Sequence, residues 1–446
     1  MTLTATRLTQ HQSLLSQTTP ATVPNLPTTN RLFRFHTKRP SLPIILFNRA
    51  GFGQRPLDLE QFQQLGATDT QRLINYVEQQ LNPNSISDTD FETYLAAANF
   101  STIHKSRAEL SSAHLQKTIE YPQQTLPLRE LERLNFLRAI YSRSQLVELL
   151  ADFWHDYFNI YAWQSPQIAA TIIDYDANVI RANLLGNYQQ FVDAVVSSSE
   201  WQLSNEIANL SPWQEMEDHE ETARFVCTKL CCRFISDHPT SQIVQSATTI
   251  FLNQQSAPDQ LKQVVRHILL STEFQNTWGE KVKRPFETIV SALRATNTNL
   301  IIQYDHAISD SFMWRYSQIG QAPFASPEPG GYPDVKSHWQ NNTHLRMRWR
   351  MINWLMELQD ENGRFHLNTQ PQSGSPQKQT ANTLVDYWIN HIFGYKIAPE
   401  DRQILVNYLA NDQRLDAPIN LLTQSGQQRL RETIALMLNS PQFQLR

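Results

Sequence analysis

Two neighbouring segments, Leu128-Arg-Glu-Leu-Glu-Arg-Leu-Asn-Phe-Leu-Arg-Ala-Ile-Tyr141 and Ser144-Gln-Leu-Val-Glu-Leu-Leu-Ala-Asp-Phe-Trp-His-Asp-Tyr-Phe-Asn-Ile-Tyr161, decide the fold class. In the second segment the apolar residues return with the spacing of an α-helix and fill one broad face. They are Leu146, Leu149, Leu150, Phe153, Trp154, Tyr157 and Phe158. Both segments therefore predict long helices.

The rest of the composition agrees with a helical protein. The chain has 446 residues, enough to bury a large core, and only 12 of them are glycine. Tight β-hairpins favour glycine where the backbone needs a positive φ, so this scarcity argues against a many-stranded β fold. We predict an all-α fold, a large assembly of helical hairpins joined by long loops rich in Pro and Gly. Further helices are predicted over 57–81, 91–98, 105–120, 174–184, 188–196 and 217–235.

Composition shifts divide the chain into three parts. Residues 1–40 begin with a stretch rich in Thr, Gln, Ser and Pro and are predicted to be a disordered or extended tail. Residues 41–300 are predicted to form a helical domain, and 301–446 a C-terminal helical segment. The C-terminal segment contains a loop over 318–338, dense in Pro and Gly, which is either a lid or a rigid connector held on the core by its aromatic side chains.

A weak internal repeat is also visible. Phe234-Ile-Ser, Pro239, a helix, a polar loop and the segment 264–275 are echoed by Ile392-Phe-Gly, Pro399, a helix, a polar loop and the segment 434–444. Two copies are too few for a solenoid, so we expect related helical hairpins at two ends of one assembly.

The charge and the cysteines limit the function classes. The net charge is −4, and a nucleic-acid partner is not expected because such proteins carry a basic face. No uninterrupted apolar stretch reaches the roughly 18 residues that span a bilayer, and no signal peptide is visible, which favours the cytoplasm. Cys227, Cys231 and Cys232 are expected to be buried thiols, although a metal site with His219 or His238 is an alternative.

The polar face of the 144–161 helix is the first candidate site. Asp152, His155 and Asp156 lie three and four residues apart and share one stripe. A carboxylate beside a histidine can orient the imidazole and raise its basicity, as general acid–base catalysis or metal binding requires. These three residues are the catalytic candidates; no metal-ligand set or cofactor follows from the sequence. Any amphipathic helix also has a polar face, so a solvated surface is the simpler expectation.

A second candidate group could bind a ligand. It comprises Tyr332, Asp334, Trp339, Arg346 and Arg350, with Trp349 and Trp354 nearby. Arginines beside indole rings bind anions or stack on ligands, but a pair of surface arginines over a tryptophan-rich core is the commoner arrangement.

Several short motifs, in order along the chain, resemble the bacterial domain of unknown function 1800 family. The blocks are Leu46-Phe-Asn-Arg-Ala-Gly-Phe-Gly53, Phe153-Trp-His-Asp-Tyr-Phe158, Ile180-Arg through Gly186-Asn-Tyr188, Thr222-Ala-Arg-Phe-Val226, Lys281-Val-Lys-Arg-Pro-Phe-Glu287, Gly331-Tyr-Pro-Asp334 and Ser440-Pro-Gln-Phe-Gln-Leu-Arg446. The resemblance covers the chain from about residue 42 onward. It implies a largely helical protein of a family that is often exported and has no established activity.

Three departures from the family pattern bear on function. Ile45 and Tyr157 stand where the resemblance implies histidines, and the central region is shorter, with 205–210 as the remnant of a polar helix. We therefore expect a non-catalytic role in binding a protein partner or acting as a scaffold. The alternative is a metal-dependent or hydrolase-like enzyme that uses Asp152, His155 and Asp156. A third hypothesis is ligand or carbohydrate binding through Trp339, Trp349 and Trp354.

Overall fold

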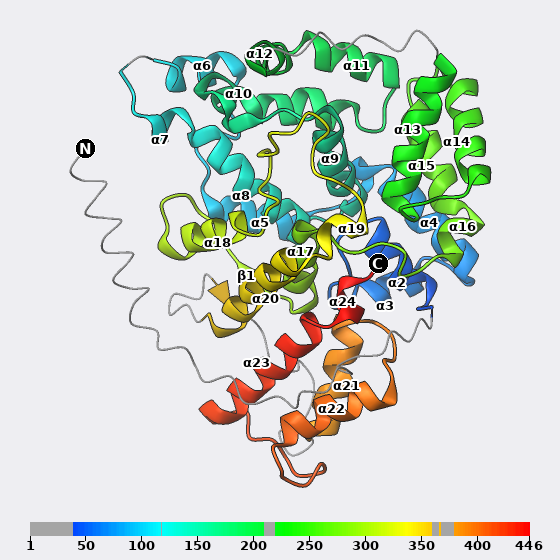
Figure 1. The fold of residues 1–446 in the computed structure, drawn as a ribbon, viewed down its shortest axis with the longest axis vertical. Coiled ribbons are helices and arrows are strands. Elements are labelled where there is room, and N and C mark those ends of the chain that lie inside the picture. The colour runs from blue at the N-terminus through cyan, green and yellow to red at the C-terminus, as the bar shows by residue number, and fades with distance from the viewer. Residues whose placement is uncertain (1–38, 117, 209–218, 359–364, 367–378) are drawn as a thin grey trace. The chain divides into compact units, whose positions relative to one another are not determined.

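The structure is a computed structural model that describes residues 39–116, 118–208, 219–358, 365–366 and 379–446. The all-α fold is confirmed, because helices connected by loops account for nearly all of these residues (Figure 1). Their only sheet is a single antiparallel pairing of two residues, β1 (Asn299–Leu300) with β2 (Phe365–His366). The predicted tail over 1–40 lies almost wholly outside the described residues, and the boundary at residue 300 stays a prediction.

The first half of the described chain builds two groups of helices. One group runs to the end of the long helix that carries the candidate stripe. It comprises α2 (Leu42–Arg49), α3 (Asp58–Gln64), α4 (Asp69–Gln80), the 3-10 turn η1 (Pro83–Ser85), α5 (Thr89–Ala98), α6 (Arg107–His114), α7 (Tyr121–Gln124), α8 (Leu126–Tyr141) and α9 (Gln145–Phe158). The other group comprises η2 (Ala162–Gln164), α10 (Pro166–Tyr175), the π-helix η3 (Asp176–Arg181), α11 (Tyr188–Ser197) and α12 (Ser199–Ala208).

Several predicted helix boundaries are wrong, among them that of the helix expected over 105–120, which is α6 and ends at His114. The single helix expected over 57–81 is two helices, because the chain turns at Gly66 and Thr68 starts α4 by accepting a hydrogen bond from the amide of Gln71. The helix expected over 174–184 begins earlier, as α10. That helix is buried along most of its length, so it has no polar face for a periodicity to show.

The second half contains the two copies of the repeat and the helices between them. The first copy comprises α13 (His219–Phe234), α14 (Ser241–Asn253), α15 (Gln260–Leu270) and α16 (Thr272–Asn276). Between the copies lie α17 (Pro285–Ala295), α18 (Ala307–Ser317), α19 (Lys336–Trp339) and α20 (Asn342–Glu357). The second copy comprises α21 (Ala381–Ile392), α22 (Pro399–Ala410), α23 (Gln424–Leu438) and α24 (Pro441–Gln444).

The two copies correspond in detail as well as in helix order. Ser271 starts α16 by accepting from the amide of Phe274, and Ser440 starts α24 by accepting from the amide of Phe443. The segments that follow the two short helices pair with each other in antiparallel fashion. The amide of Lys283 donates to the carbonyl of Gln444 at 2.8 Å, and the amide of Arg446 donates to the carbonyl of Lys281 at 3.0 Å. This pairing places Arg446 beside the start of α17.

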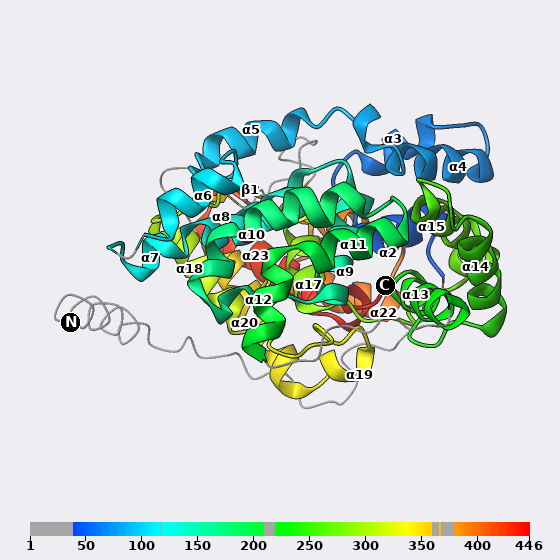
Figure 2. The same cartoon turned by 90° about the horizontal axis from the view of Figure 1, so that it is seen from above.

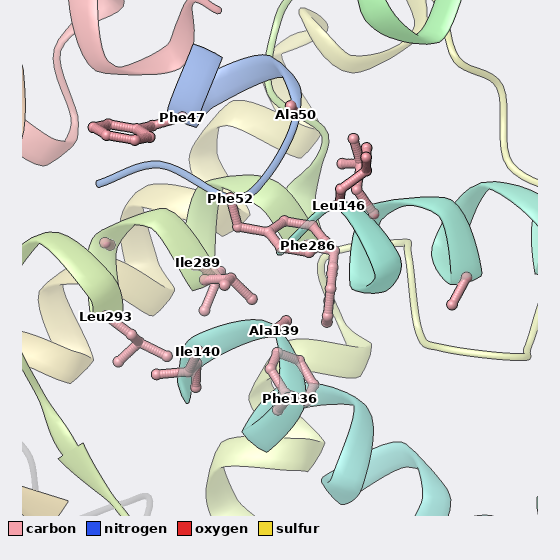
Figure 3. Packing of buried hydrophobic residues seen from close by; sticks show 14 of the residues in the cluster. Phe47, Ala50, Phe52, Phe136, Ala139, Ile140, Leu146, Phe286, Ile289 and Leu293 are labelled. Atoms are coloured by element: carbon pink, nitrogen blue, oxygen red, sulfur yellow. The ribbon is translucent and has the colours of Figure 1, made fainter. Parts of the chain in front are cut away.

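Helix α17 lies at the centre of the fold. All of its residues are buried, and it contacts α8, α20 and α21 (Figure 2). Phe286 packs edge-on against Phe52 and tilted against Phe136, with ring centroids 5.4 and 4.9 Å apart (Figure 3). The Lys-Arg-Pro-Phe-Glu block therefore enters the core directly, with Pro285 at the first helical position, where its missing N–H leaves no helical hydrogen bond unmade.

The loop over 318–338 is irregular until α19 begins, as predicted, and it lies against the end of α9 (Figure 1). The amide of Ala162 donates to the carbonyl of Phe324 at 2.9 Å, and the Tyr332 hydroxyl donates to the carbonyl of Ala322 at 2.9 Å. Gly331 has φ +68°, and a Cβ there would come within 2.2 Å of the carbonyl oxygen of Asp156. Glycine is required where the loop crosses α9.

The cysteine prediction is confirmed for two of the three thiols. Cys227 and Cys231 are fully buried, and burial raises the pKa of the Cys227 thiol to about 12, while Cys232 is half-buried. The side chain of His219 lies outside the described set. Within the described ranges, no helix is both long and apolar enough to cross a membrane.

Candidate functional site

The polar stripe of α9 does not face solvent. The side chains of Asp152, His155 and Asp156 are only 13%, 12% and 20% exposed, because α13, α17, η3 and the 318–338 loop cover them. The expectation of a solvated face is therefore wrong. A helical wheel shows which residues are opposite the apolar face, but it does not show which other segments pack on that face. The stripe instead enters two separate ion networks.

His155 belongs to the first network. Its Nε2 lies 2.9 Å from Asp176 in η3, and its ring packs edge-on against Tyr175 and Phe324. Asp176 also accepts from Arg181 and Arg138, at 2.8 Å each. We call Glu148, Asp176, Arg138, Arg181 and His155 the closed network.

The closed network satisfies its own charges. Arg181 donates to Asp176 and, with both terminal nitrogens, to Glu148 at 3.1 and 2.8 Å. Burial opposes the charge of Asp176, yet Arg181, His155 and Arg138 together hold the pKa of that carboxyl well below its usual range. None of the five side chains has a buried polar atom without a hydrogen bond. In this arrangement His155 and Asp176 hold each other in place, and the Nε2 atom of His155 is already used in the contact with Asp176.

Asp152 and Asp156 belong to the second network. Arg284, the residue before α17, donates to both carboxylates, and Arg233 of α13 donates to Asp152 at 3.0 Å. Arg233 also pairs with Glu287 at 2.6 Å. The amide of Arg284 in turn donates to Glu287, a contact that fixes the first turn of α17.

The 318–338 loop and the end of the described chain complete this network. Asp334 lies 3.1 Å from the Lys281 ammonium and 3.7 Å from Arg233, and Arg446 lies 3.2 Å from Glu287. The loop is thus tied to the core by charge. We call the whole set the cavity network: Asp152, Asp156, Arg233, Lys281, Arg284, Glu287, Asp334 and Arg446.

In the cavity network, burial and the neighbouring charges shift the pKa values of the carboxyl groups in opposite directions. Burial raises the pKa of Asp156 to about 7 against the pull of Arg284. Burial also opposes the charge of Glu287, but Arg233, Arg446 and Arg284 outweigh it and lower the pKa of Glu287 to about 2. Several guanidinium atoms here have no hydrogen-bond acceptor in the described chain, among them Nε of Arg233, Arg284 and Arg446.

Four of the eight members of the cavity network line a cavity of about 570 Å³. The charged lining residues are Asp156, Lys229, Arg233, Arg284 and Asp334. The walls are largely aromatic and come from α9, α12, α13 and the loop, with Phe153, Tyr157, Phe158, Tyr161, Trp201, Phe225 and Tyr332. Only Asp156 of the three catalytic candidates reaches this cavity. Asp152 and His155 border a second, much smaller one of about 30 Å³.

The ligand-binding candidates divide between two places. Tyr332 and Asp334 line the large cavity, whereas Trp339 is 1% exposed and donates from its indole nitrogen to the carbonyl of Pro333 at 2.6 Å. Trp339 therefore holds the loop and offers no face to a ligand. The third hypothesis requires an exposed ring at this position, and Trp339 does not provide one. Arg346 and Arg350 are exposed on α20, away from the cavity lining.

Sequence reasoning missed the cationic half of the site. Arg233 and Arg284 are almost fully buried, and each sits in a helical or proline-flanked segment where a surface position is the usual expectation. Trp201 and Phe225 were missed as well. Phe225 is 46% exposed, and an exposed aromatic cannot be told from a core aromatic by spacing on a helix. The Lys-Arg-Pro-Phe-Glu block was the one available signal.

In the part of the chain that the structure describes, no group of three or more His, Cys, Asp or Glu side chains is placed to hold a metal ion. A further cavity of about 600 Å³ lies near α3 and α4 and is lined by polar side chains. Arg294 at the end of α17 reaches it, bonded to the carbonyl of Gly53 at 2.9 Å and to that of Ile140 at 2.7 Å. None of the predicted site residues lies there.

These features define a multi-helical protein whose central helix anchors a buried ion network beneath an aromatic-walled cavity. The family described as protein of unknown function (DUF1800) matches residues 45–200 and 214–445, and the chain belongs to that family. The resemblance drawn from the short motifs is confirmed. Comparison with curated proteins gives no match, and neither does comparison with solved structures. The shortening of the central region stays a prediction.

Proposed function

We propose that this protein acts by binding a protein partner, without catalysis, and that the aromatic-walled cavity receives an apolar or aromatic side chain of that partner. The observation that carries the proposal is the pairing of the stripe. Asp152, His155 and Asp156 each bind charged groups of the same chain. Carboxylates held by arginine are acceptors already in use, and among them that of Asp156 lines the cavity.

The walls of the cavity suit such an occupant. Aromatic side chains are enriched at the centre of protein interfaces because each offers a large rigid area at a low cost in conformational entropy. Phe225 projects at the rim with the Lys229 ammonium 5.3 Å from its ring, and Trp201 lines the wall contributed by α12. Filling the cavity would remove this apolar surface from water, at about 25 cal/mol per Å².

Selection from a displayed peptide library tests this proposal. Peptides selected on the purified protein should share an aromatic or large apolar residue, and their binding should fall about tenfold or more with Phe225→Ala, the scale of an interface hot spot. Leu422→Ala is the matched control, because Leu422 is 88% exposed and lies outside the cavity lining. Peptides that bind equally well to both variants would contradict the proposal.

One observation favours the hydrolase-like alternative. Asp156 lines the cavity with a pKa raised by burial to about 7, where a carboxyl group acts well as a general acid or base near neutral pH. The test is a panel of ester, peptide and phosphate substrates. Turnover that is lost in Asp156→Asn, while the variant stays folded by circular dichroism, would replace the binding proposal with this one.

A further inference from the structure

A cluster of tryptophan and arginine side chains lies on the surface formed by α18 and α20, which are side by side in both views (Figures 1 and 2). We call it the Trp–Arg patch, and its members are Trp314, Arg315, Arg346, Trp349, Arg350 and Trp354. Trp314 and Trp349 are 55% and 44% exposed. The Arg315 guanidinium joins the two helices, since its central carbon lies 4.9 Å from the Trp354 ring and 5.9 Å from the Trp314 ring.

The positive charge of this patch has no negative partner in the described residues. No carboxylate there forms an ion pair with the exposed Arg346 and Arg350 or with the half-buried Arg315, although most other buried or half-buried arginines in the described ranges have one. The Nε atom of Arg315 is buried and has no hydrogen-bond acceptor. Burial and the nearby charge of Arg350 both lower the pKa of Arg315. A carboxylate that docks beside Arg315 and Arg350 would offset the repulsion between the two guanidinium groups.

We infer that the Trp–Arg patch is a docking surface for an acidic segment of a protein partner. Carboxylates of the segment bind Arg315 and Arg350, and its apolar side chains cover the Trp314 ring. Charge complementarity selects this occupant. A nucleic acid needs a long basic surface, whereas here three arginines form a local patch on a chain of net charge −4.

The patch is independent of the proposed cavity function. None of its six residues lines the large cavity, so loss of one binding event should leave the other intact. A segment that reached both places would gain affinity from the second contact through its high effective concentration.

Fluorescence anisotropy with two synthetic peptides tests the inference. The first peptide alternates Glu and Leu, and the second alternates Lys and Leu. The protein should bind only the acidic peptide, with an affinity that falls as salt rises. Arg350→Glu should weaken binding at least about tenfold, because one attractive contact becomes repulsive. Arg414→Glu is the control with the same change in net charge, on an arginine whose side chain is 85% exposed and remote in sequence.

The remaining outcomes would overturn the inference. Binding of an oligothymidine in preference to the acidic peptide would make the patch a nucleic-acid surface. Binding of a neutral oligosaccharide, unaffected by salt or by Arg350→Glu, would make it a carbohydrate surface. No binding of the acidic peptide, or an equal loss in Arg350→Glu and Arg414→Glu, would show that the exposed tryptophans and arginines serve the packing of α18 on α20 alone. Comparison of Trp314→Ala with Arg350→Glu separates the contribution of the Trp314 ring to peptide binding from the contribution of charge.

Discussion

The closed network and the cavity network begin within one turn of each other on α9, and they differ in how completely their charges are satisfied. In the closed network, Arg181 bridges Asp176 and Glu148, and each of its members is hydrogen-bonded within the fold. In the cavity network, Arg284 and Arg233 share the carboxylates of α9 but keep nitrogen atoms without acceptors, and the network borders a cavity.

This difference separates a structural role from a binding role. A buried charge pair is costly to assemble and very costly to break, so a fully satisfied network holds segments in one arrangement. In the cavity network the nitrogen atoms without acceptors are themselves buried, and the group that is open to the cavity is the Asp156 carboxylate, whose side chain is 20% exposed. Helix α9 therefore joins α8 and η3 on one side and provides part of a binding site on the other.

Arg181→Met should have the largest effect on stability. It leaves Asp176 and Glu148 as buried carboxylates that have lost their shared partner, and breaking such a pair costs about 3–5 kcal/mol. The measurement is the free energy of unfolding in urea. Arg414→Met is the control, because that arginine pairs with Asp416 at an exposed position and its loss should leave the free energy of unfolding nearly unchanged.

Arg284→Met should cost less, about 2 kcal/mol. The side chain of Asp156 is 20% exposed and borders the cavity, so water can solvate it when Arg284 is lost, and Arg233 still pairs with Asp152. Measured in the same urea titration, a loss equal to that of Arg181→Met would show that the cavity does not hydrate the Asp156 carboxylate. The distinction between the two networks would then fail.

Lys283→Met should change how stability depends on pH. Lys283 is buried with its ammonium 4.0 Å from the Phe443 ring, and burial lowers its pKa to about 7, with Glu287 opposing and Arg446 adding to the shift. Between pH 7 and about 10.4, the unfolded chain holds this proton and the folded chain does not. Stability therefore rises with pH in that window, by up to about 1.4 kcal/mol per pH unit.

The variant should lose this slope. Free energies of unfolding at pH 7, 8 and 9, taken as differences between wild type and Lys283→Met, isolate the contribution of Lys283. Lys281→Met is the matched control: Lys281 is equally buried but pairs with Asp237 at 2.9 Å and Asp334 at 3.1 Å, so its removal should destabilise the protein. Parallel pH profiles for wild type and Lys283→Met would mean that Lys283 stays protonated in the core.

The helices could be predicted from the sequence wherever one face is apolar and the other polar, as in α9. Of the candidate site, the sequence predicts the carboxylates but not the arginines that bind them. Asp152 and Asp156 belong to a visible stripe, but their partners Arg233 and Arg284 lie 81 and 128 residues away along the chain. Periodicity describes one helix at a time and contains no information about such a pairing, which depends on where α13 and α17 pack.

Tyr332→Phe should have the smallest effect and tests the loop above the cavity. The Tyr332 hydroxyl donates to the carbonyl of Ala322 at 2.9 Å, so its loss should cost about 1 kcal/mol in unfolding and loosen a loop that Asp334 still anchors. Amide hydrogen exchange should increase in 322–334 and stay unchanged in η3. Tyr157→Phe removes a different cavity hydroxyl, bonded to Tyr188 at 3.1 Å, and should leave the loop unaffected. Faster exchange in η3 with Tyr332→Phe would instead couple the two networks, because His155 touches both Asp176 and Phe324 of the loop.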